Sequence, residues 1–583
     1  MKTGSPGSRR VGGEEESPSL GTSHLLPFVE LALWSSNTAV KYSAVAGLST
    51  LAKVAENKRM MGSIGALECL TSIVFEEENP MKSTFMAPND MQRKKEPSAT
   101  SKKVKADMKL KRLAAATLAD LMTDRENQDI YVGVNGVQKT NALLLETKSL
   151  GLQQPLVAVL CSLAGNEDYK QQLVREGALL ALFKAAQSSS EKCRLFAFHA
   201  CKRLSADEDN QVSWGEGHLL EIVSWLKKEE LDIKFHMIAM ETLRQLAQHP
   251  ENATYITTQS DAVFTIAKYL DADEYDDDVR KSTILCLGQI VQTANTRPKL
   301  AIPEVLEGFL ACIMRNVAER DIRAVRLELS VIKLIADCKE NAGLMSTRIW
   351  IEILLRYVLE CRDRVCKRHA AQSLQHVALN MEDVSPLIYQ TENFSRGMCE
   401  VNDATVSKLS GFIVDKLSRA DHGRKLMRPH ANAIFHRCSR WVKEPEYQLM
   451  SVEIAANLAM ELRTKEEIDL MLPRLDNFML LTKSKHKPTQ EAAVRLLHNL
   501  SSCEKEQQQK LVEKGIVWRM KSVQRSAGAS EMARFTASTA LKGNLKLQAA
   551  AIMIQSMIRG RIQRKLALEK AGKRKQQQSL RKN

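Results

Sequence analysis

Apolar and small residues recur along this chain at a nearly constant interval. Each landmark stands near the end of an apolar run, and successive landmarks are 40 to 45 residues apart. The landmarks are Leu121, Leu163-Ala164, Leu204-Ser205, Leu246-Ala247, Ile290-Val291, Ile335-Ala336, Val377-Ala378, Leu417-Ser418, Leu458-Ala459 and Leu500-Ser501. An earlier one, Leu51-Ala52, precedes Leu121 by 70 residues, which indicates an insertion of roughly thirty residues in that repeat.

The runs before the landmarks have the period of an α-helix. In "EAAVRLLHNLSS", Ala493, Leu496, Leu497 and Leu500 fall on one helix face. A unit of about 42 residues cannot bury such a face alone, so stacked neighbours must cover it. The spacing therefore predicts an all-α array of helical repeats.

Several landmarks are followed at a fixed distance by Asn, and then by Gly before an apolar pair. This order occurs in "LVAVLCSLAGNEDYKQQLVREGALLAL" and in "AAVRLLHNLSSCEKEQQQKLVEKGIVW". We expect Gly65, Gly177 and Gly515 to adopt the left-handed conformation, which ends one helix and lets the next begin.

These features resemble the armadillo-repeat family, whose pattern is small-x-x-Leu-x-Asn-Leu-Ala, then Asn, then Gly-Ala-Leu or Gly-Ala-Ile. The resemblance covers about residues 25–535, or eleven repeats, and is thinnest between 290 and 450. It implies a right-handed α-solenoid of three-helix repeats, with the third helices lining a concave groove. The related HEAT repeat is an alternative for the middle units.

The groove can be compared with that of the nuclear-import adaptors of this family, which resemble one another in a Trp-x-x-x-Asn ladder. Asn457 and Asn499 occupy the Asn position, but Glu453 and Arg495 stand where Trp is expected. A reader of basic import signals is therefore disfavoured. These four residues remain the candidates for a groove that binds an unidentified protein, although both Asn residues also fit a purely structural role.

The positive charge of the chain is concentrated in two segments. The net charge is +15, whereas residues 541–583 carry +11 and residues 91–112 carry +7. The rest of the solenoid is thus slightly acidic, and nucleic acid is not the expected partner. We expect residues 1–24, the basic insertion 76–105 and the basic tail 571–583 to be disordered. "RKKEPSATSKKVK" and "KRKQQQSLRK" loosely resemble nuclear import signals, a pattern also common in solvated loops.

A different pattern begins after the repeats, in residues 541–570. "LQAAAIMIQSMIRGRIQRK" is a basic amphipathic helix by its spacing. It matches the IQ motif at every defined position, and this resemblance implies a binding site for calmodulin or a related EF-hand light chain. In such a complex Ile554 and Ile558 would enter an apolar groove, and Gly560 would allow a lobe to approach closely. The predicted binding residues are Ile554, Gln555, Ile558, Arg559, Gly560 and Arg564. A basic helix that caps the last repeat is the alternative.

No other segment predicts chemistry. "DADEYDDD" lacks the Gly and closing Glu of an EF-hand loop, and Cys361, Cys366 and His369 lack a second ligand pair for zinc. The sequence contains no phosphate-binding loop or nucleophile elbow. We expect no catalytic residue, metal, cofactor, small-molecule substrate or transmembrane segment, and we expect reduced cysteines.

The sequence therefore predicts a non-enzymatic scaffold whose solenoid binds a protein and whose IQ helix recruits calmodulin. We expect it in the cytoplasm, in association with the cytoskeleton or a cilium, with nuclear entry left open. Two alternatives remain. One is a transport or chaperone adaptor that holds an extended peptide, and the other is a tail that anchors the solenoid to microtubules, anionic lipid or RNA.

Overall fold

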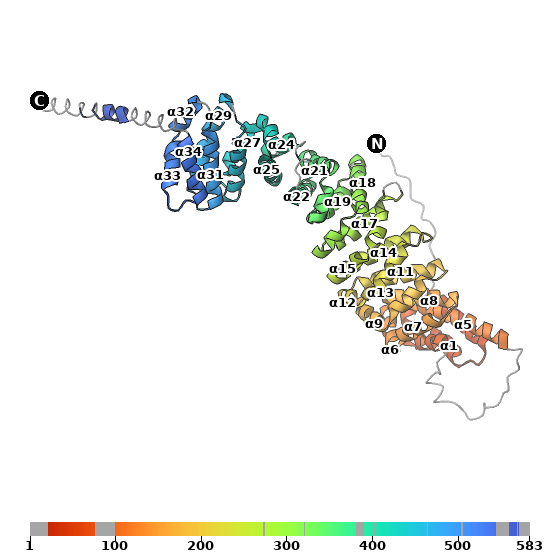
Figure 1. The fold of residues 1–583 in the computed structure, drawn as a ribbon. Helices are drawn as coiled ribbons and strands as arrows, with labels where there is room; N and C mark the ends of the chain where they lie inside the picture. The colour runs from red at the N-terminus through yellow and green to blue at the C-terminus, as the bar shows by residue number, and fades with distance from the viewer. Residues whose placement is uncertain are drawn as a thin grey trace, which may run out of the picture. The chain divides into compact units, whose positions relative to one another are not determined.

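The structure is a computed structural model in which the described residues fold into stacked α-helices (Figure 1). Described are residues 21–75, 100–259, 261–271, 274–319, 321–380, 387, 390–400, 403–462, 464–502, 505–543, 559–567 and 570. These residues form helices and turns and no strand, as the repeat pattern predicts. None of the described helices has both the length and the apolarity needed to cross a membrane.

The chain divides into two compact units, 1–296 and 297–583. The α-helices of the first unit are α1 (Thr22–Trp34), α2 (Thr38–Leu51), α3 (Ala55–Ser63), α4 (Ala66–Phe75), α5 (Thr100–Leu121), α6 (Arg125–Gly133), α7 (Gly136–Glu146), α8 (Leu150–Leu163), α9 (Lys170–Arg175), α10 (Ala178–Ala186), α11 (Glu191–Ser205), α12 (Glu208–Ser213), α13 (Gly215–Leu226), α14 (Ile233–Leu246), α15 (Pro250–Thr258), α16 (Ala262–Ala267) and α17 (Asp277–Ile290).

The second unit repeats the same arrangement. Its α-helices are α18 (Pro303–Glu319), α19 (Ile322–Ala336), α20 (Lys339–Met345), α21 (Arg348–Glu360), α22 (Arg364–Asn380), α24 (Thr391–Glu400), α25 (Ala404–Arg419), α26 (Asp421–Met427), α27 (Ala431–Trp441), α28 (Gln448–Leu458), α29 (Lys465–Met471), α30 (Leu475–Leu480), α31 (Lys487–Leu500), α32 (Lys505–Glu513), α33 (Ile516–Arg525) and α34 (Glu531–Gly543).

Short 3-10 helices occur between several of these elements. They are η2 (Glu167–Tyr169), η3 (Lys268–Leu270), η4 (Ala294–Leu300), η5 (Arg428–His430), η6 (Pro445–Tyr447), η7 (Leu472–Arg474) and η8 (Leu481–Lys483).

The landmarks of the sequence mark the ends of the third helices. Leu51, Leu121, Leu163, Leu246 and Leu500 are each the last residue of a helix, and the other landmarks lie within three residues of a helix end or just after it. These helices pack side by side in chain order, from α2 to α17 in the first unit and from α19 to α34 in the second. The predicted repeat is therefore confirmed, because each landmark closes the helix that contacts the equivalent helix of the next repeat.

A residue in the left-handed backbone conformation separates the first helix of several repeats from the second helix. Gly65, Gly177 and Gly515 have φ angles of 82°, 83° and 85°, which confirms the predicted conformation. Asn135 occupies the same place before α7 with φ 57°. Asn is one of the few residues with a side chain that visit this region readily.

The Asn that follows several landmarks is a buried connection between repeats. The Nδ2 of Asn252 donates to the carbonyl oxygens of Leu246, at 3.1 Å, and of Gln211 in the preceding repeat, at 2.8 Å. Asn127 donates in the same way to Leu121 and Lys58, and Asn341 to Ile335 and Arg297. Each side chain thus satisfies a carbonyl at a helix end, which has no partner within its own helix.

The array differs from the predicted boundaries at three places. Helix α1 begins at Thr22, so its first residues overlap the terminus predicted as disordered over 1–24. Helix α5 begins at Thr100, so its first turns overlap the insertion predicted over 76–105. Helix α34 continues to Gly543 and packs on α31 and α33, which extends the array beyond residue 535. Residues 1–20, 76–99 and 571–583 lie outside the described part of the chain, so their predicted disorder stays a prediction.

Candidate protein-binding groove and C-terminal helix

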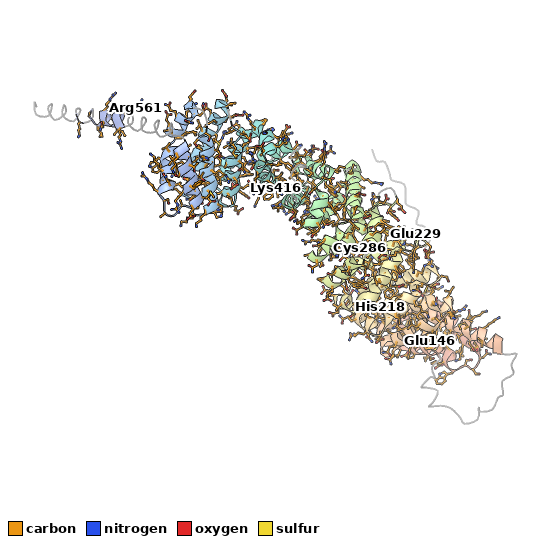
Figure 2. The ribbon with its side chains drawn as sticks, viewed as in Figure 1. Glu146, His218, Glu229, Cys286, Lys416 and Arg561 are labelled. Atoms are coloured by element: carbon orange, nitrogen blue, oxygen red, sulfur yellow. The ribbon has the colours of Figure 1, made fainter. Side chains whose placement is uncertain are left out.

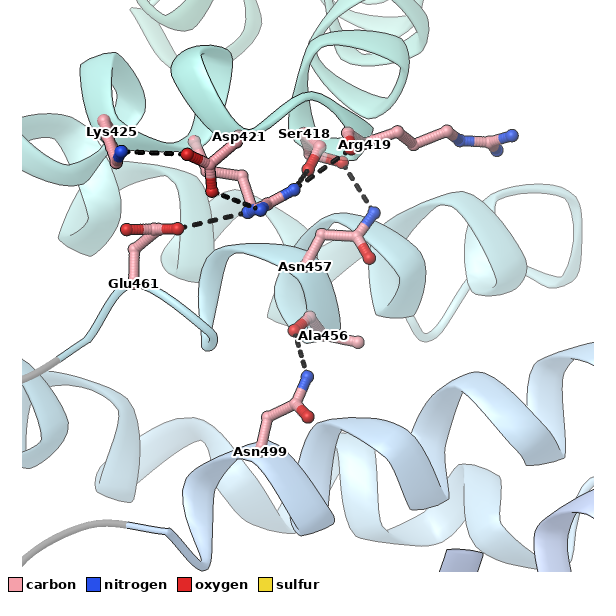
Figure 3. A network of polar contacts seen from close by, with 9 residues as sticks. Ser418, Arg419, Asp421, Lys425, Ala456, Asn457, Glu461 and Asn499 are labelled. Atoms are coloured by element: carbon pink, nitrogen blue, oxygen red, sulfur yellow. Dashed lines mark hydrogen bonds and ion pairs between the residues drawn. The ribbon is translucent and has the colours of Figure 1, made fainter.

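The two Asn residues predicted for the groove connect neighbouring third helices. The Nδ2 of Asn457 on α28 donates to Ser418 Oγ on α25 at 2.9 Å (Figure 3). The Nδ2 of Asn499 on α31 donates to the carbonyl oxygen of Ala456 at 2.8 Å, again in the preceding repeat (Figure 3). Both side chains are half-buried, and each holds its repeat to the one before.

Other repeats use different side chains at the same position for the same purpose. Arg203 Nη1 donates to the Cys161 carbonyl at 2.6 Å, and Gln245 Oε1 accepts from Ser205 Oγ at 2.5 Å. Lys416 on α25, labelled in Figure 2, donates to the Ala378 carbonyl. In these repeats the position connects neighbouring third helices with Arg, Gln, Lys or Asn, which fits the structural role considered for Asn457 and Asn499.

The residues that replace Trp are brought together as an ion pair. Arg495 Nη2 on α31 lies 2.8 Å from Glu453 Oε2 on α28, with the side chains 43% and 21% exposed. Helices α28 and α31 are neighbours. The residues four positions before each Asn therefore also contact the adjacent repeat. The two charges of this pair compensate each other. A ligand could bind either charge only by breaking the ion pair between Arg495 and Glu453.

A buried carboxylate next to this pair gave no signal in the sequence. Asp415 on α25 is 7% exposed and pairs with Arg419 Nη2 at 2.8 Å, while its Oδ1 has no hydrogen-bond partner. Burial raises the pKa of Asp415 to about 6, against the lowering effect of Arg419. Glu453 raises it further, because two carboxylates near one another disfavour a second negative charge.

The loop after α25 is fixed by a single guanidinium. Arg424 Nε lies 3.3 Å from Glu461 Oε1, and Arg424 Nη2 lies 2.8 Å from Asp421 Oδ1 (Figure 3). Its Nη1 also donates to the Ser418 carbonyl at 3.2 Å. Glu461 and Arg424 are almost fully buried, so this network is a structural connection between repeats.

An apolar pocket of about 690 Å³ lies in the second unit, between the end of α21 and the start of α19. Ile322, Val325 and Tyr357 line it, and the buried Tyr357 hydroxyl has no hydrogen-bond partner among the described residues. Burial, with the nearby Glu328, raises the pKa of Tyr357. Sequence reasoning missed this pocket, since its walls come from separate helices of two repeats.

The rejected metal motifs have structural roles. Asp276 of the acidic segment caps α17 by accepting from the Val279 amide at 3.0 Å. Cys366 is fully buried, and burial raises the pKa of its thiol to about 12. Across the described residues, no group of three or more His, Cys, Asp or Glu side chains is placed to hold a metal ion.

The predicted IQ motif is only partly within the described residues. Ile554, Gln555 and Ile558 lie outside them, whereas Arg559, Gly560 and Arg564 belong to a helical segment over 559–567. Arg561, labelled in Figure 2, is exposed, as are Ile562 and Leu566 at 53% and 51%. Within the described part of the chain, a Cβ built on Gly560 would meet no atom within 4 Å, so no contact there requires a glycine.

Comparisons with known proteins identify the fold. A structure from work on the phosphorylation switch that controls the interaction between cadherin and β-catenin covers 89% of this chain and 99% of its own, with a TM-score of 0.58 and 12% identity. The fold is an armadillo-like α-solenoid. A computationally designed armadillo repeat protein for modular peptide recognition covers 46% of the solenoid chain and 99% of its own, with a TM-score of 0.37 and 19% identity. No protein-family model and no curated protein sequence matches.

Proposed function

We propose that this armadillo-like protein is a non-enzymatic interaction scaffold. Its solenoid binds a protein partner along the third helices, and its C-terminal segment recruits calmodulin or a related EF-hand light chain. The observation that carries the proposal is the union of two parts in one chain. One is a stacked repeat array whose third helices are joined by contacts such as Asn457–Ser418 and Arg495–Glu453, and the other is an exposed basic helix with an IQ pattern.

The C-terminal helix supports recruitment of a light chain through its exposure. Arg559 and Arg564 are solvent-exposed on one short helix, where they can pair with an acidic rim. Ile562 and Leu566 are exposed as well, although apolar side chains on an isolated helix gain stability only by burial against a partner. Gly560 costs about 1 kcal/mol of helix propensity without serving a contact in this structure, which favours a role in a complex.

Titration of calmodulin into the full chain tests this proposal, with calcium and with a chelator, at about 150 mM salt. We expect submicromolar binding that is lost in an Ile554→Asp, Arg559→Ala variant. The calcium dependence will show whether the scaffold is regulated by calcium.

The matched control is a Leu545→Asp, Arg561→Ala variant. It makes the same two changes of chemistry in the same segment, but outside the defined positions of the motif. Calmodulin should bind this control nearly as well as the parent chain. Equal loss in both variants would contradict a light-chain site and favour the electrostatic anchor, whose strength depends on total charge and salt.

A further inference from the structure

A polar pocket of about 430 Å³ lies in the first unit, where the third helices α8, α11 and α14 end. Ser162, Arg203 and Gln245, which stand at the groove position of three successive repeats, all line it. The rest of the wall comes from the loops that follow α5, α8 and α11 and from the first helices next to them. The pocket therefore opens at the edge of the groove and joins neighbouring repeats.

The charge of this pocket is opposite in sign to the small negative net charge of the solenoid apart from the basic insertion 91–112. Arg125, Lys170, Lys202 and Arg203 line it, against one carboxylate, Glu167. Lys170 is 5% exposed, and its Nζ lies 2.7 Å from Glu167 Oε1, whose side chain is 79% exposed. Lys170, one of the four cations of the wall, is thus already paired with the solvent-exposed carboxylate of Glu167.

Two further cations complete the basic wall. Arg125 is exposed and Lys202 is half-buried. Glu241 is the acid that Lys202 influences, but its carboxylate is hydrogen-bonded to Arg244 at 2.8 Å and 2.7 Å. Arg244, and after it Lys202, lower the pKa of the Glu241 carboxyl, which is therefore ionised. Glu241 is hydrogen-bonded to Arg244 and is not among the residues that line the pocket.

The wall is held in place before any ligand arrives. Arg203 Nη1 donates to the Cys161 carbonyl at 2.6 Å, and the buried Asn166 Nδ2 donates to Gln128 Oε1 at 2.8 Å. Side chains fixed in this way lose little conformational entropy when a ligand binds. A preorganised guanidinium is suited to a carboxylate, which it can bind through two parallel hydrogen bonds.

We propose that this pocket binds an acidic side chain of an extended protein segment that lies in the groove of the first unit. The inference rests on the proposed scaffold function and gives the chemistry of its partner. A basic segment is repelled by the same wall, because like charges in a partly desolvated site oppose binding. The groove therefore selects acidic partners, although the solenoid apart from the basic insertion and tail has a small negative net charge.

Fluorescence anisotropy of the full chain with two labelled peptides tests the proposal at about 150 mM salt. One peptide alternates glutamate with alanine, and the other alternates lysine with alanine. We expect the acidic peptide to bind and the basic one not to bind. In an Arg125→Glu, Lys202→Glu variant the acidic peptide should bind at least about tenfold more weakly, since about 1.4 kcal/mol corresponds to tenfold.

The matched control is a Lys148→Glu, Lys192→Glu variant, which makes the same change of net charge at two exposed residues of the first unit outside the pocket. It should change affinity by less than about threefold. Equal weakening in both variants, preference for the basic peptide, or complete displacement by inorganic phosphate at the same concentration of anionic groups would overturn the inference. Calmodulin titration of the same variants separates this outcome from failure of the scaffold proposal, because the IQ segment is unchanged.

Discussion

Some single residues in this chain contact both their own repeat and the next ones. Asp415 shows what that arrangement costs, because it is buried beside Arg419 and close to the Glu453–Arg495 pair of the two following repeats. Its pKa of about 6 lies above the value of about 3.9 in an unfolded chain. The folded state therefore binds this proton more tightly, and ionisation of Asp415 opposes folding above pH 6.

An Asp415→Asn variant should be more stable than the parent at pH 7, by up to about 2 kcal/mol, because the amide needs no charge in the buried site. The advantage should shrink as the pH falls through 6 and should vanish near pH 4, where the parent is protonated in both states. Chemical denaturation at several pH values measures this difference. An advantage that is independent of pH would contradict the assignment to Asp415.

Asp421→Asn is the control for this prediction. Lys425, followed by Arg424, lowers the pKa of the exposed Asp421 carboxyl. A lowered pKa stabilises the fold above the unfolded value and loses that effect in acid. This variant should therefore be no more stable than the parent at pH 7, the opposite of Asp415→Asn.

At the scale of elements, the sequence predicts the helices and their separators well, since both depend on local properties. The positions Leu51 to Leu500 repeat because every third helix must bury the same face, and Gly65, Gly177 and Gly515 occur where the backbone needs a positive φ. Both requirements are visible in one unit of sequence. The boundaries of α5 and α34 were less accurate, because packing extends a helix beyond its apolar pattern.

Two glycines of the first unit make this local argument testable. Gly177 has φ 83°, whereas Gly133 lies within helix α6, and a Cβ at either position would meet no atom within 4 Å. Gly177→Ala should lower the free energy of unfolding by about 1 kcal/mol, because the left-handed conformation is unfavourable for alanine. Gly133→Ala should raise it by up to about 0.5 kcal/mol, because alanine favours the helical conformation of this last residue of α6. Equal effects of the two substitutions on thermal or urea unfolding would show that the separator does not require glycine.

The candidate site was less predictable than the helices. Asn457, Asn499, Glu453 and Arg495 could be placed on third helices from the sequence, but their partners lie about forty residues away in the preceding or following repeat. Arg125 and Lys202 meet in one pocket only through the registration of the stack. The net charge of the chain gives no sign of this basic pocket. The charge at a site depends on which loops lie next to one another in the fold, and the sequence alone does not show that.

At the scale of the molecule, stability is the sum of many similar contacts between neighbours. Asn252 in the first unit and Asn341 in the second each donate to two backbone carbonyls, one in their own repeat and one in the preceding repeat. Replacement by alanine should cost about 2 kcal/mol locally, because buried carbonyls lose their donor. The effect should remain within the adjoining repeats.

Hydrogen exchange followed by mass spectrometry measures this prediction. Asn252→Ala should speed exchange in the helices around α14 and α15 and leave α28 to α34 unchanged. Asn341→Ala should do so around α19 and α20 and leave α2 to α8 unchanged. Faster exchange throughout the chain in either variant would contradict a stack held by nearest neighbours.

The buried Asn contacts have a consequence for how such a chain can evolve. Their acceptors are main-chain oxygens of Lys58, Gln211 and Arg297, so the side chains of these three residues take no part in the bonds. A carbonyl is present whichever amino acid is encoded, so a mutation at the acceptor position leaves the bond intact. Each of these acceptor positions can therefore change without a matching change in the neighbouring repeat.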